Sequence, residues 1–170
     1  GLDTYWPQFD GLKERLEGNL KIVHNKLKSY GPEVINLGLI DTTDKAFDAG
    51  HQFRENDVDL IFLYVTTYAL SSTVLPLVRR AKVPIVILNL TPQLAVDYQE
   101  FNSHNDRTKM TGEWWAHCSP CPVPEIANVF TRTGVSFHQV TGSIQDDKEV
   151  WNEIEAWVEA AKVAHTMAHN

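Results

Sequence analysis

Cysteine and basic residues are both scarce in this sequence of 170 residues. Two cysteines are too few for a scaffold held together by disulfides. The 15 Lys and Arg residues against 22 Asp and Glu residues give a net charge of -7. This balance argues against nucleic-acid binding, because phosphate recognition needs clustered cations. No apolar run approaches the roughly 18 residues of a membrane span, and no signal-peptide pattern is present. We therefore expect a cytoplasmic protein that binds neither nucleic acid nor membrane.

Several motifs of common enzymes are also missing. The chain has no GxGxxG and no GxxxxGK followed by Ser or Thr, so nucleotide binding lacks its usual phosphate loop. It has no GxSxG nucleophile elbow and no HExxH metal motif. The seven histidines are scattered, and we expect none of them to pair with a Glu at ligand spacing. By itself the chain holds no complete catalytic set, and no metal site is predicted in it.

Helix and strand signals alternate along the chain. Apolar residues at helical spacing predict helices at 11–29, 41–55, 71–81, 123–132 and 146–165. Short apolar runs predict strands at 34–40, 60–65, 83–88 and 135–140. This alternation predicts right-handed βαβ crossovers, a parallel sheet and helices on both of its faces. Residues 89–112 are polar and aperiodic, and a loop of that length is usually functional or disordered.

The opening segment 3–9 (DTYWPQF) is a polar and aromatic loop directly before the first predicted helix. In open α/β sheets, ligands bind where strands end and helices begin. Such a loop needs a strand in front of it, so we expect the first strand of the sheet to be absent or truncated. The sheet then has about five strands when that strand is counted. We expect residues 1–170 to form one α/β domain cut from a larger protein.

Segment 3–9 combines hydroxyl, amide and aromatic groups, which suit a polyhydroxylated ligand that needs hydrogen bonds and a flat apolar surface. The alternative is that Trp6 and Phe9 cover the end of the sheet. Segment 66–68, which includes Tyr68, follows a strand and faces the same crevice, although helix capping also explains it. Segment 113–115 either positions a ligand or packs against another subunit.

The sharpest local motif is Cys118-Ser119-Pro120-Cys121, with His117 beside it. A CxxC pair at the start of a helix forms dithiol redox centres in other proteins, because the helix dipole stabilises a thiolate. It also makes half of a zinc site, to which His117 adds a third ligand. The third possibility is that both cysteines simply pack a tight loop before the next helix. The sequence leaves these three interpretations open.

Four segments resemble the N-terminal domain of the L-arabinose isomerase family, and the similarity runs in order along essentially the whole chain. They are 1–9 (GLDTYWPQF), 60–72 (LIFLYVTTYALSS), 83–90 (VPIVILNL) and 111–126 (TGEWWAHCSPCPVPEI). The resemblance implies a flavodoxin-like fold. It also implies an enzyme that converts an aldose to a ketose, L-arabinose to L-ribulose, by proton transfer on the open-chain sugar. A divalent metal, usually Mn²⁺, polarises the sugar oxygens in this family.

The resemblance also implies roles for individual residues. The family's metal ligands lie in later domains, so none is expected in this chain. Its N-terminal domain lends side chains to the sugar site and packs into a trimer or hexamer. By position, Trp6, Gln8, Phe9 and Tyr68 would border the sugar pocket. Cys118 and Cys121 would lie in a segment that reaches a neighbouring subunit's site, where the better-known branch of the family has an amide and an imidazole.

Three hypotheses follow from the sequence. The first is the N-terminal substrate-side and assembly domain of a metal-dependent sugar isomerase. The second is a stand-alone sugar-binding or regulatory module without catalysis. The third is a dithiol oxidoreductase built on Cys118 and Cys121.

Overall fold

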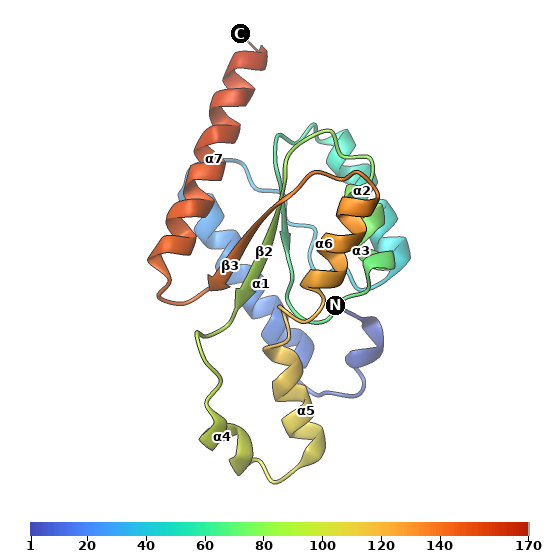
Figure 1. The fold of residues 1–170 in the computed structure, drawn as a ribbon, viewed down its shortest axis with the longest axis vertical. Helices are drawn as coiled ribbons and strands as arrows, with labels where there is room; N and C mark the ends of the chain where they lie inside the picture. The colour runs from blue at the N-terminus through green and yellow to red at the C-terminus, as the bar shows by residue number, and fades with distance from the viewer. Residues whose placement is uncertain (170) are drawn as a thin grey trace.

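A parallel sheet of three strands lies at the centre of the computed structural model, which describes residues 1–169 (Figure 1). Its strands are β1 (Ile61–Tyr64), β2 (Ile85–Thr91) and β3 (His138–Ser143), in that spatial order. The register places Ile61 opposite Ile85, and Val86 opposite His138. β2 is buried from its first residue to Leu90, as expected for a parallel strand covered on both faces.

Helices cover both faces of this sheet (Figure 1). α1 (Leu12–Ser29) and α7 (Lys148–His169) lie against one face, and α2 (Thr43–Glu55), α3 (Ser71–Val78) and α6 (Val123–Arg132) lie against the other. The two faces of β2 therefore belong to two apolar clusters, one containing Ile85 and Ile87 and the other Val86 and Leu88. This confirms the predicted α/β class. Within residues 1–169, no helix is both long enough and apolar enough to cross a bilayer.

The predicted loop at 89–112 is wrong, because this stretch contains regular structure. β2 continues to Thr91, and two helices follow, α4 (Tyr98–Ser103) and α5 (Arg107–Ala116). Asp97 and Asp106 each accept two backbone N–H bonds at the start of one of these helices. The helices are short, and α4 buries none of its residues, so the apolar spacing that would reveal them is missing.

The predicted strand at 34–40 is also wrong. These residues belong to neither a helix nor a strand, and among the described backbone hydrogen bonds none joins them to β1. Their composition suits a strand, but a strand exists only where a neighbour completes its ladder of hydrogen bonds. The structure therefore shows three of the expected strands. It also starts β3 at His138, three residues later than the predicted start at Val135.

Gly50 allows α2 and α3 to approach each other closely. A Cβ atom at this position would lie 2.9 Å from the Pro76 carbonyl oxygen and 3.5 Å from that of Leu77. Both oxygens belong to the backbone of α3, so they cannot move aside as the end of a flexible side chain can. The packing of the two helices depends on this missing side chain.

We expect Gly50→Ala to lower the free energy of unfolding by about 1–3 kcal/mol, because overpacking outweighs the gain in helix propensity. The matched control is Gly18→Ala in α1, where an added Cβ meets nothing within 4 Å. That variant should be more stable by about 0.5–1 kcal/mol. Urea denaturation measures both, and equal stability of the two variants would contradict the close approach.

Candidate functional site at the carboxyl edge of the sheet

Four aromatic side chains meet beyond the carboxyl ends of the strands, and we call them the edge cluster: Tyr5, Phe9, Tyr68 and Trp115. The rings of Tyr5 and Trp115 are stacked, with centroids 4.9 Å apart and planes at 22°. Phe9 meets Tyr5 edge-on at 6.1 Å, and Tyr68 lies 6.2 Å from Trp115. Figure 1 shows the strands pointing toward the 3-10 helix η1 (Asp3–Tyr5) and α5, which carry two of these rings.

Local contacts hold the edge cluster in place. The Thr67 hydroxyl, fully buried after β1, donates to the Trp115 carbonyl oxygen at 2.6 Å and so ties the end of β1 to α5. Phe9 lies over Gly112, where an added Cβ would be 3.4 Å from the Phe9 Cβ. Leu12 and Leu16 of α1 are buried in an apolar cluster against which Tyr5, Phe9 and Trp115 pack. These contacts bring three distant parts of the chain to one edge of the sheet.

A carboxylate lies beside the edge cluster. Glu125, near the start of α6, accepts a hydrogen bond from the Tyr68 hydroxyl at 3.4 Å and one from the Ser71 backbone N–H at 3.2 Å. Hydrogen bonds from the Ser71 hydroxyl and N–H, with a smaller one from Tyr68, hold the pKa of Glu125 below its usual value. Glu125 is exposed and ionised at neutral pH, so its oxygens can accept hydrogen bonds from a ligand's hydroxyl groups.

An ion-pair network lies on the α1 side of α5. The Glu113 carboxylate accepts from the Arg15 guanidinium, and its other oxygen lies 3.2 Å from His117 Nε2. Arg15 Nη2 lies 3.4 Å from the same ring nitrogen. The hydrogen bond from Arg15 holds the pKa of Glu113 below its usual value, with a smaller contribution from His117. Arg15 and Glu113 therefore join α1 to α5 directly beside the edge cluster.

This network corrects the expectation that no histidine pairs with a glutamate. Glu113 and His117 are four residues apart, which places them on one face of a helix. The spacing was visible in the sequence, but residues 113–117 lie outside every predicted helix, and this spacing brings two side chains together only on a helix. Recognising the Asp106 cap of α5 would have revealed the pair. The partner from α1, Arg15, carries no such signal, because it is 98 residues from Glu113.

The predicted sugar-site residues fall into two groups. Phe9 and Tyr68 are members of the edge cluster. Trp6 instead donates its indole N–H to the buried Asp41 carboxylate at 2.8 Å, and Gln8 donates its amide to the carbonyl oxygen of Thr4 at 2.6 Å. Trp6 thus bonds to a buried carboxylate and packs against the same buried residues as Phe9, whereas Gln8 is exposed and bonds within its own segment.

Cys118 and Cys121 form a disulfide just before α6. Cys118 is 3% exposed, whereas Cys121 is exposed. Two sulfurs bonded to each other are not free thiolates, so this form does not supply the half zinc site considered from the sequence. The Ser119 side chain between the cysteines is fully buried, and its hydroxyl has no hydrogen-bond partner among the described residues.

The carboxyl edge does not fit a manganese site. Mn²⁺ prefers several carboxylate, carbonyl or water oxygens around it. The Glu113 carboxylate is already engaged by Arg15, and Glu125 by Ser71 and Tyr68. Among residues 1–169, the group with closely spaced ligand atoms is Asp59, His165 and His169, all exposed and near the amino end of β1.

Comparison with known protein families finds no family whose model matches this sequence, and comparison with curated proteins finds no match. The interpretation of the site therefore rests on its geometry. The edge cluster gathers half-buried aromatic rings, and one of its phenol hydroxyls is bonded to an exposed, ionised carboxylate. This combination can hold a small ligand that has both C–H faces and hydroxyl groups.

Asp41 connects segment 3–9 to α2, and its charge depends on that connection. Burial by itself would raise the pKa of Asp41, but the hydrogen bonds from Lys45 at 2.6 Å and from Trp6 at 2.8 Å outweigh burial and lower it. A carboxylate with a lowered folded-state pKa stabilises the fold above its unfolded pKa of about 3.9. That stability is lost as the pH falls through the folded-state pKa.

We expect Trp6→Phe to remove one of these bonds, lower the free energy of unfolding at pH 7 by about 1.5–3 kcal/mol and raise the pKa of Asp41. Because the bond stabilises the ionised form, the loss should shrink as the pH falls toward 2. Urea denaturation at both pH values and an NMR titration of Asp41 test this. Trp114→Phe, at a half-exposed position with no hydrogen bond from its indole among the described residues, should change stability by less than about 0.5 kcal/mol. Equal effects of the two variants would contradict the role of Trp6.

Proposed function

We propose that this chain is the substrate-side and assembly domain of a metal-dependent aldose–ketose isomerase of the L-arabinose to L-ribulose type. The observation that carries the proposal is the edge cluster with Glu125 beside it at the carboxyl edge of a parallel sheet. Ligands of α/β sheets bind at this edge. The reaction type comes from the resemblance of segments 1–9, 60–72, 83–90 and 111–126 to the L-arabinose isomerase family.

A sugar suits the side chains at this edge. The C–H face of an aldose or ketose packs on an aromatic ring, while its hydroxyls need donors and acceptors. Tyr68 supplies a phenol, and ionised Glu125 accepts hydrogen bonds. In this proposal Phe9, Tyr68 and Trp115 bind and orient the sugar. Trp6 and Gln8 contribute by placing segment 3–9, because the Trp6 indole bonds to Asp41 and the exposed Gln8 side chain bonds to Thr4 within the segment.

The proton transfer itself is assigned to the assembled enzyme. In the family, Mn²⁺ polarises the sugar oxygens while a proton moves between two carbons of the open chain. Because the carboxyl edge does not fit a manganese site, we propose that the metal ligands lie in other domains of the cytoplasmic enzyme. This domain then contributes binding, orientation and exclusion of water.

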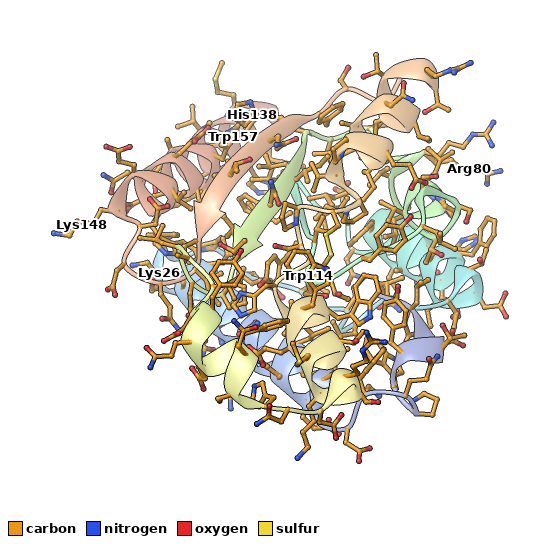
Figure 2. The ribbon with its side chains drawn as sticks, turned by 60° about the horizontal axis from the view of Figure 1, so that its bottom comes forward. Lys26, Arg80, Trp114, His138, Lys148 and Trp157 are labelled. Carbon is orange, nitrogen blue, oxygen red and sulfur yellow. A yellow bond between two sulfur atoms is a disulfide. The ribbon has the colours of Figure 1, made fainter. Side chains whose placement is uncertain are left out.

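Exposed apolar side chains support the assembly role. Leu94 is 74% exposed, Tyr98 64% and Trp114 48%, and all three lie between the end of β2 and the end of α5. Figure 2 shows Trp114 on the side of the carboxyl ends. Exposed apolar groups gathered in one region mark protein contact sites. We propose that this region packs against neighbouring subunits of a homo-oligomer, a trimer or hexamer, with Cys118 and Cys121 close to that contact.

The finer fold proposed is a flavodoxin-like sheet of five strands. Three parallel strands with helices on both faces support it. The extended segment 34–40 is the candidate for a fourth strand. The alternative function on the same fold is a sugar-binding or regulatory module without catalysis, and the edge cluster supports that alternative equally.

We expect Tyr68→Phe to weaken L-arabinose or L-ribulose binding roughly fivefold, because one hydrogen bond of about 1 kcal/mol is lost. Calorimetric titration of the chain with each sugar measures binding directly. The matched control is Tyr98→Phe, which removes a hydroxyl from a 64% exposed tyrosine and should bind as the parent does.

A chain that binds neither sugar, or a Tyr68→Phe variant with unchanged binding, would contradict the proposed site. Measuring kcat/KM in the full enzyme distinguishes the isomerase hypothesis from the binding-module hypothesis. Tyr68→Phe should lower kcat/KM for an isomerase, whereas a chain that binds sugar without any associated turnover supports the module.

The disulfide favours a second candidate function, dithiol–disulfide exchange. A substrate thiolate would attack the exposed Cys121 sulfur, and the Cys118 thiolate would leave. A second substrate thiol would then resolve the mixed disulfide. Two substrate thiols would thus become one disulfide, while the two cysteines gain two electrons and two protons. The placement of the pair just before α6 supports this chemistry, because a helix N-terminus stabilises a thiolate.

Equilibration in glutathione buffers, followed by thiol alkylation and mass spectrometry, separates this function from a structural bond. A redox enzyme should give a reduction potential between about -120 and -270 mV, whereas a structural disulfide lies below about -300 mV. As a control, Cys121→Ser should abolish any exchange activity. A reduction potential below about -300 mV would contradict the dithiol function.

A further inference from the structure

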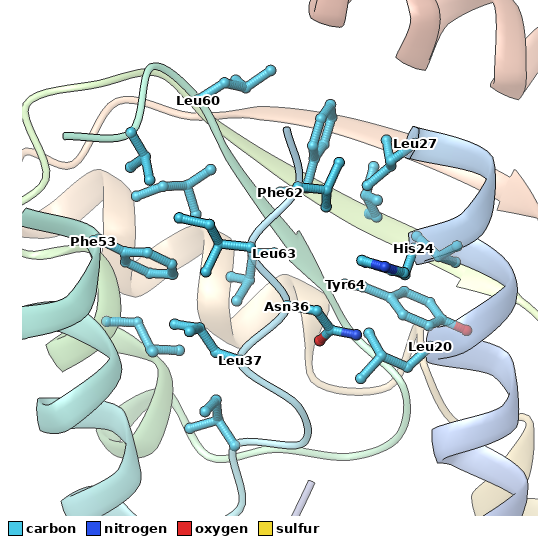
Figure 3. Close-up of a pocket in the computed structure, with 18 of the residues that line it drawn as sticks. Leu20, His24, Leu27, Asn36, Leu37, Phe53, Leu60, Phe62, Leu63 and Tyr64 are labelled. Carbon is cyan, nitrogen blue, oxygen red and sulfur yellow. The ribbon is translucent and has the colours of Figure 1, made fainter. Parts of the chain in front are cut away.

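A cavity of about 590 Å³ lies between segment 34–40 and the outer edge of β1 (Figure 3). Protein interiors are close-packed, and voids much larger than a water molecule are few. This cavity borders both apolar clusters of the domain, because Leu27 and Val158 of one cluster and Val74 and Ile126 of the other line it. We call the space between segment 34–40 and β1 the slot.

Mostly apolar side chains form both walls of the slot, with the polar His24 and Asn36 among them. On the side of α1, Phe62 and Tyr64 lie near Leu20 and Leu27 (Figure 3). On the side of α2, Leu63 lies near Leu37 and Phe53. Alternate residues of β1 therefore border the slot on opposite faces of the sheet. A guest in this position has apolar surroundings on both faces, as has a central strand of a parallel sheet.

The rims of the slot are backbone segments that join no sheet ladder on the side of the slot among residues 1–169. On the 34–40 rim, the Gly38 N–H donates to the Asn36 side chain and the Ile40 carbonyl oxygen accepts from Gly1. Ile61 and Val65 donate their N–H groups to the β2 side, to the carbonyl oxygens of Pro84 and Leu88, each at 3.0 Å. Because successive residues of a strand direct their amides to opposite sides, the amides of Phe62 and Tyr64 point into the slot. A small apolar ligand would fill the volume but leave these groups unpaired. An extended peptide fills the volume and pairs with both rims.

We propose that the slot is the binding site of an apolar β-strand that runs parallel to β1 and is joined to Gly1. The position of Gly1 indicates the direction of this strand. Its nitrogen donates to the Ile40 carbonyl oxygen at 3.2 Å, and a Cβ on Gly1 would lie 3.5 Å from Thr67 Cγ2. Gly1 thus lies at the carboxyl end of both rims. At roughly 3.3 Å per residue, about six residues leading into Gly1 match the rims.

The charge on Gly1 supports the same occupant. Burial lowers the pKa of its amino group to about 6, and the nearby Asp41 carboxylate offsets this only in part. A peptide bond at this nitrogen removes the charge and keeps an N–H for the Ile40 oxygen. The completed sheet has the order 34–40, guest strand, β1, β2, β3. The slot is separate from the edge cluster, so its filling does not depend on the proposed sugar chemistry.

Hydrogen exchange on a fusion protein tests the proposal. Six residues of alternating Val and Ile are joined to Gly1, and the matched control carries Pro at every second position, which cannot donate to a ladder. The Val–Ile fusion should slow exchange at Phe62, Tyr64 and alternate amides of 34–40 by at least about 100-fold relative to the control. Exchange at Val140, which lies on β3, serves as the internal reference.

Unchanged exchange at the rim amides, or equal slowing by both fusions, would overturn the proposal. If the Val–Ile fusion does not fold, the same peptide with a C-terminal amide is added to the unfused chain. Slowed exchange at the same amides then supports a strand site, and no slowing overturns it. Amide exchange at the rims that is already as slow in the unfused chain as in the Val–Ile fusion, together with a dimer in sedimentation, would assign the slot to a second copy. That result would overturn the proposal of a strand joined to Gly1.

Discussion

The pairing of β2 on both sides is the interaction on which the rest of the structure depends. Its hydrogen bonds to β1 and β3 set the register, and its residues alternate between the two faces. Ile85 and Ile87 enter the cluster under α2, α3 and α6, whereas Val86 and Leu88 enter the cluster under α1 and α7. Because all three strands run in one direction, their carboxyl ends share one edge, where the edge cluster forms.

The need of each strand for a hydrogen-bonded neighbour also explains the side of the sheet beyond β1. Within residues 1–169, β1 is paired only with β2, and segment 34–40 lies beyond β1 with a largely apolar composition and joins no ladder. Unpaired strand edges and exposed apolar faces favour association. In our proposals the slot concerns completion of the fold, whereas the carboxyl edge concerns ligands. The two features come close to each other near Gly1 and segment 66–68, where the slot meets the end of β1.

The sequence predicts where helices lie better than it predicts which segments contact one another. The helix at 11–29 appears as α1 and the helix at 123–132 as α6, because apolar spacing marks the face that a helix buries. Phe9 and Tyr68, which the sequence predicts at the crevice, both lie in the edge cluster, and their role in binding stays a prediction. The aperiodic helices α4 and α5 were missed, because their Asp caps define them and their burial does not.

The sequence by itself determined the α/β class, the buried central strand and the polar and aromatic character of the loops at its carboxyl end. These properties follow from local spacing and composition. Only the tertiary structure decided which side chains meet: Tyr5 on Trp115, Trp6 on Asp41, and Arg15 on Glu113, pairs separated by at least 35 residues. It also decided that 34–40 joins no sheet within the described part of the chain. A strand is completed by its neighbour, and no local pattern shows whether that neighbour is in place.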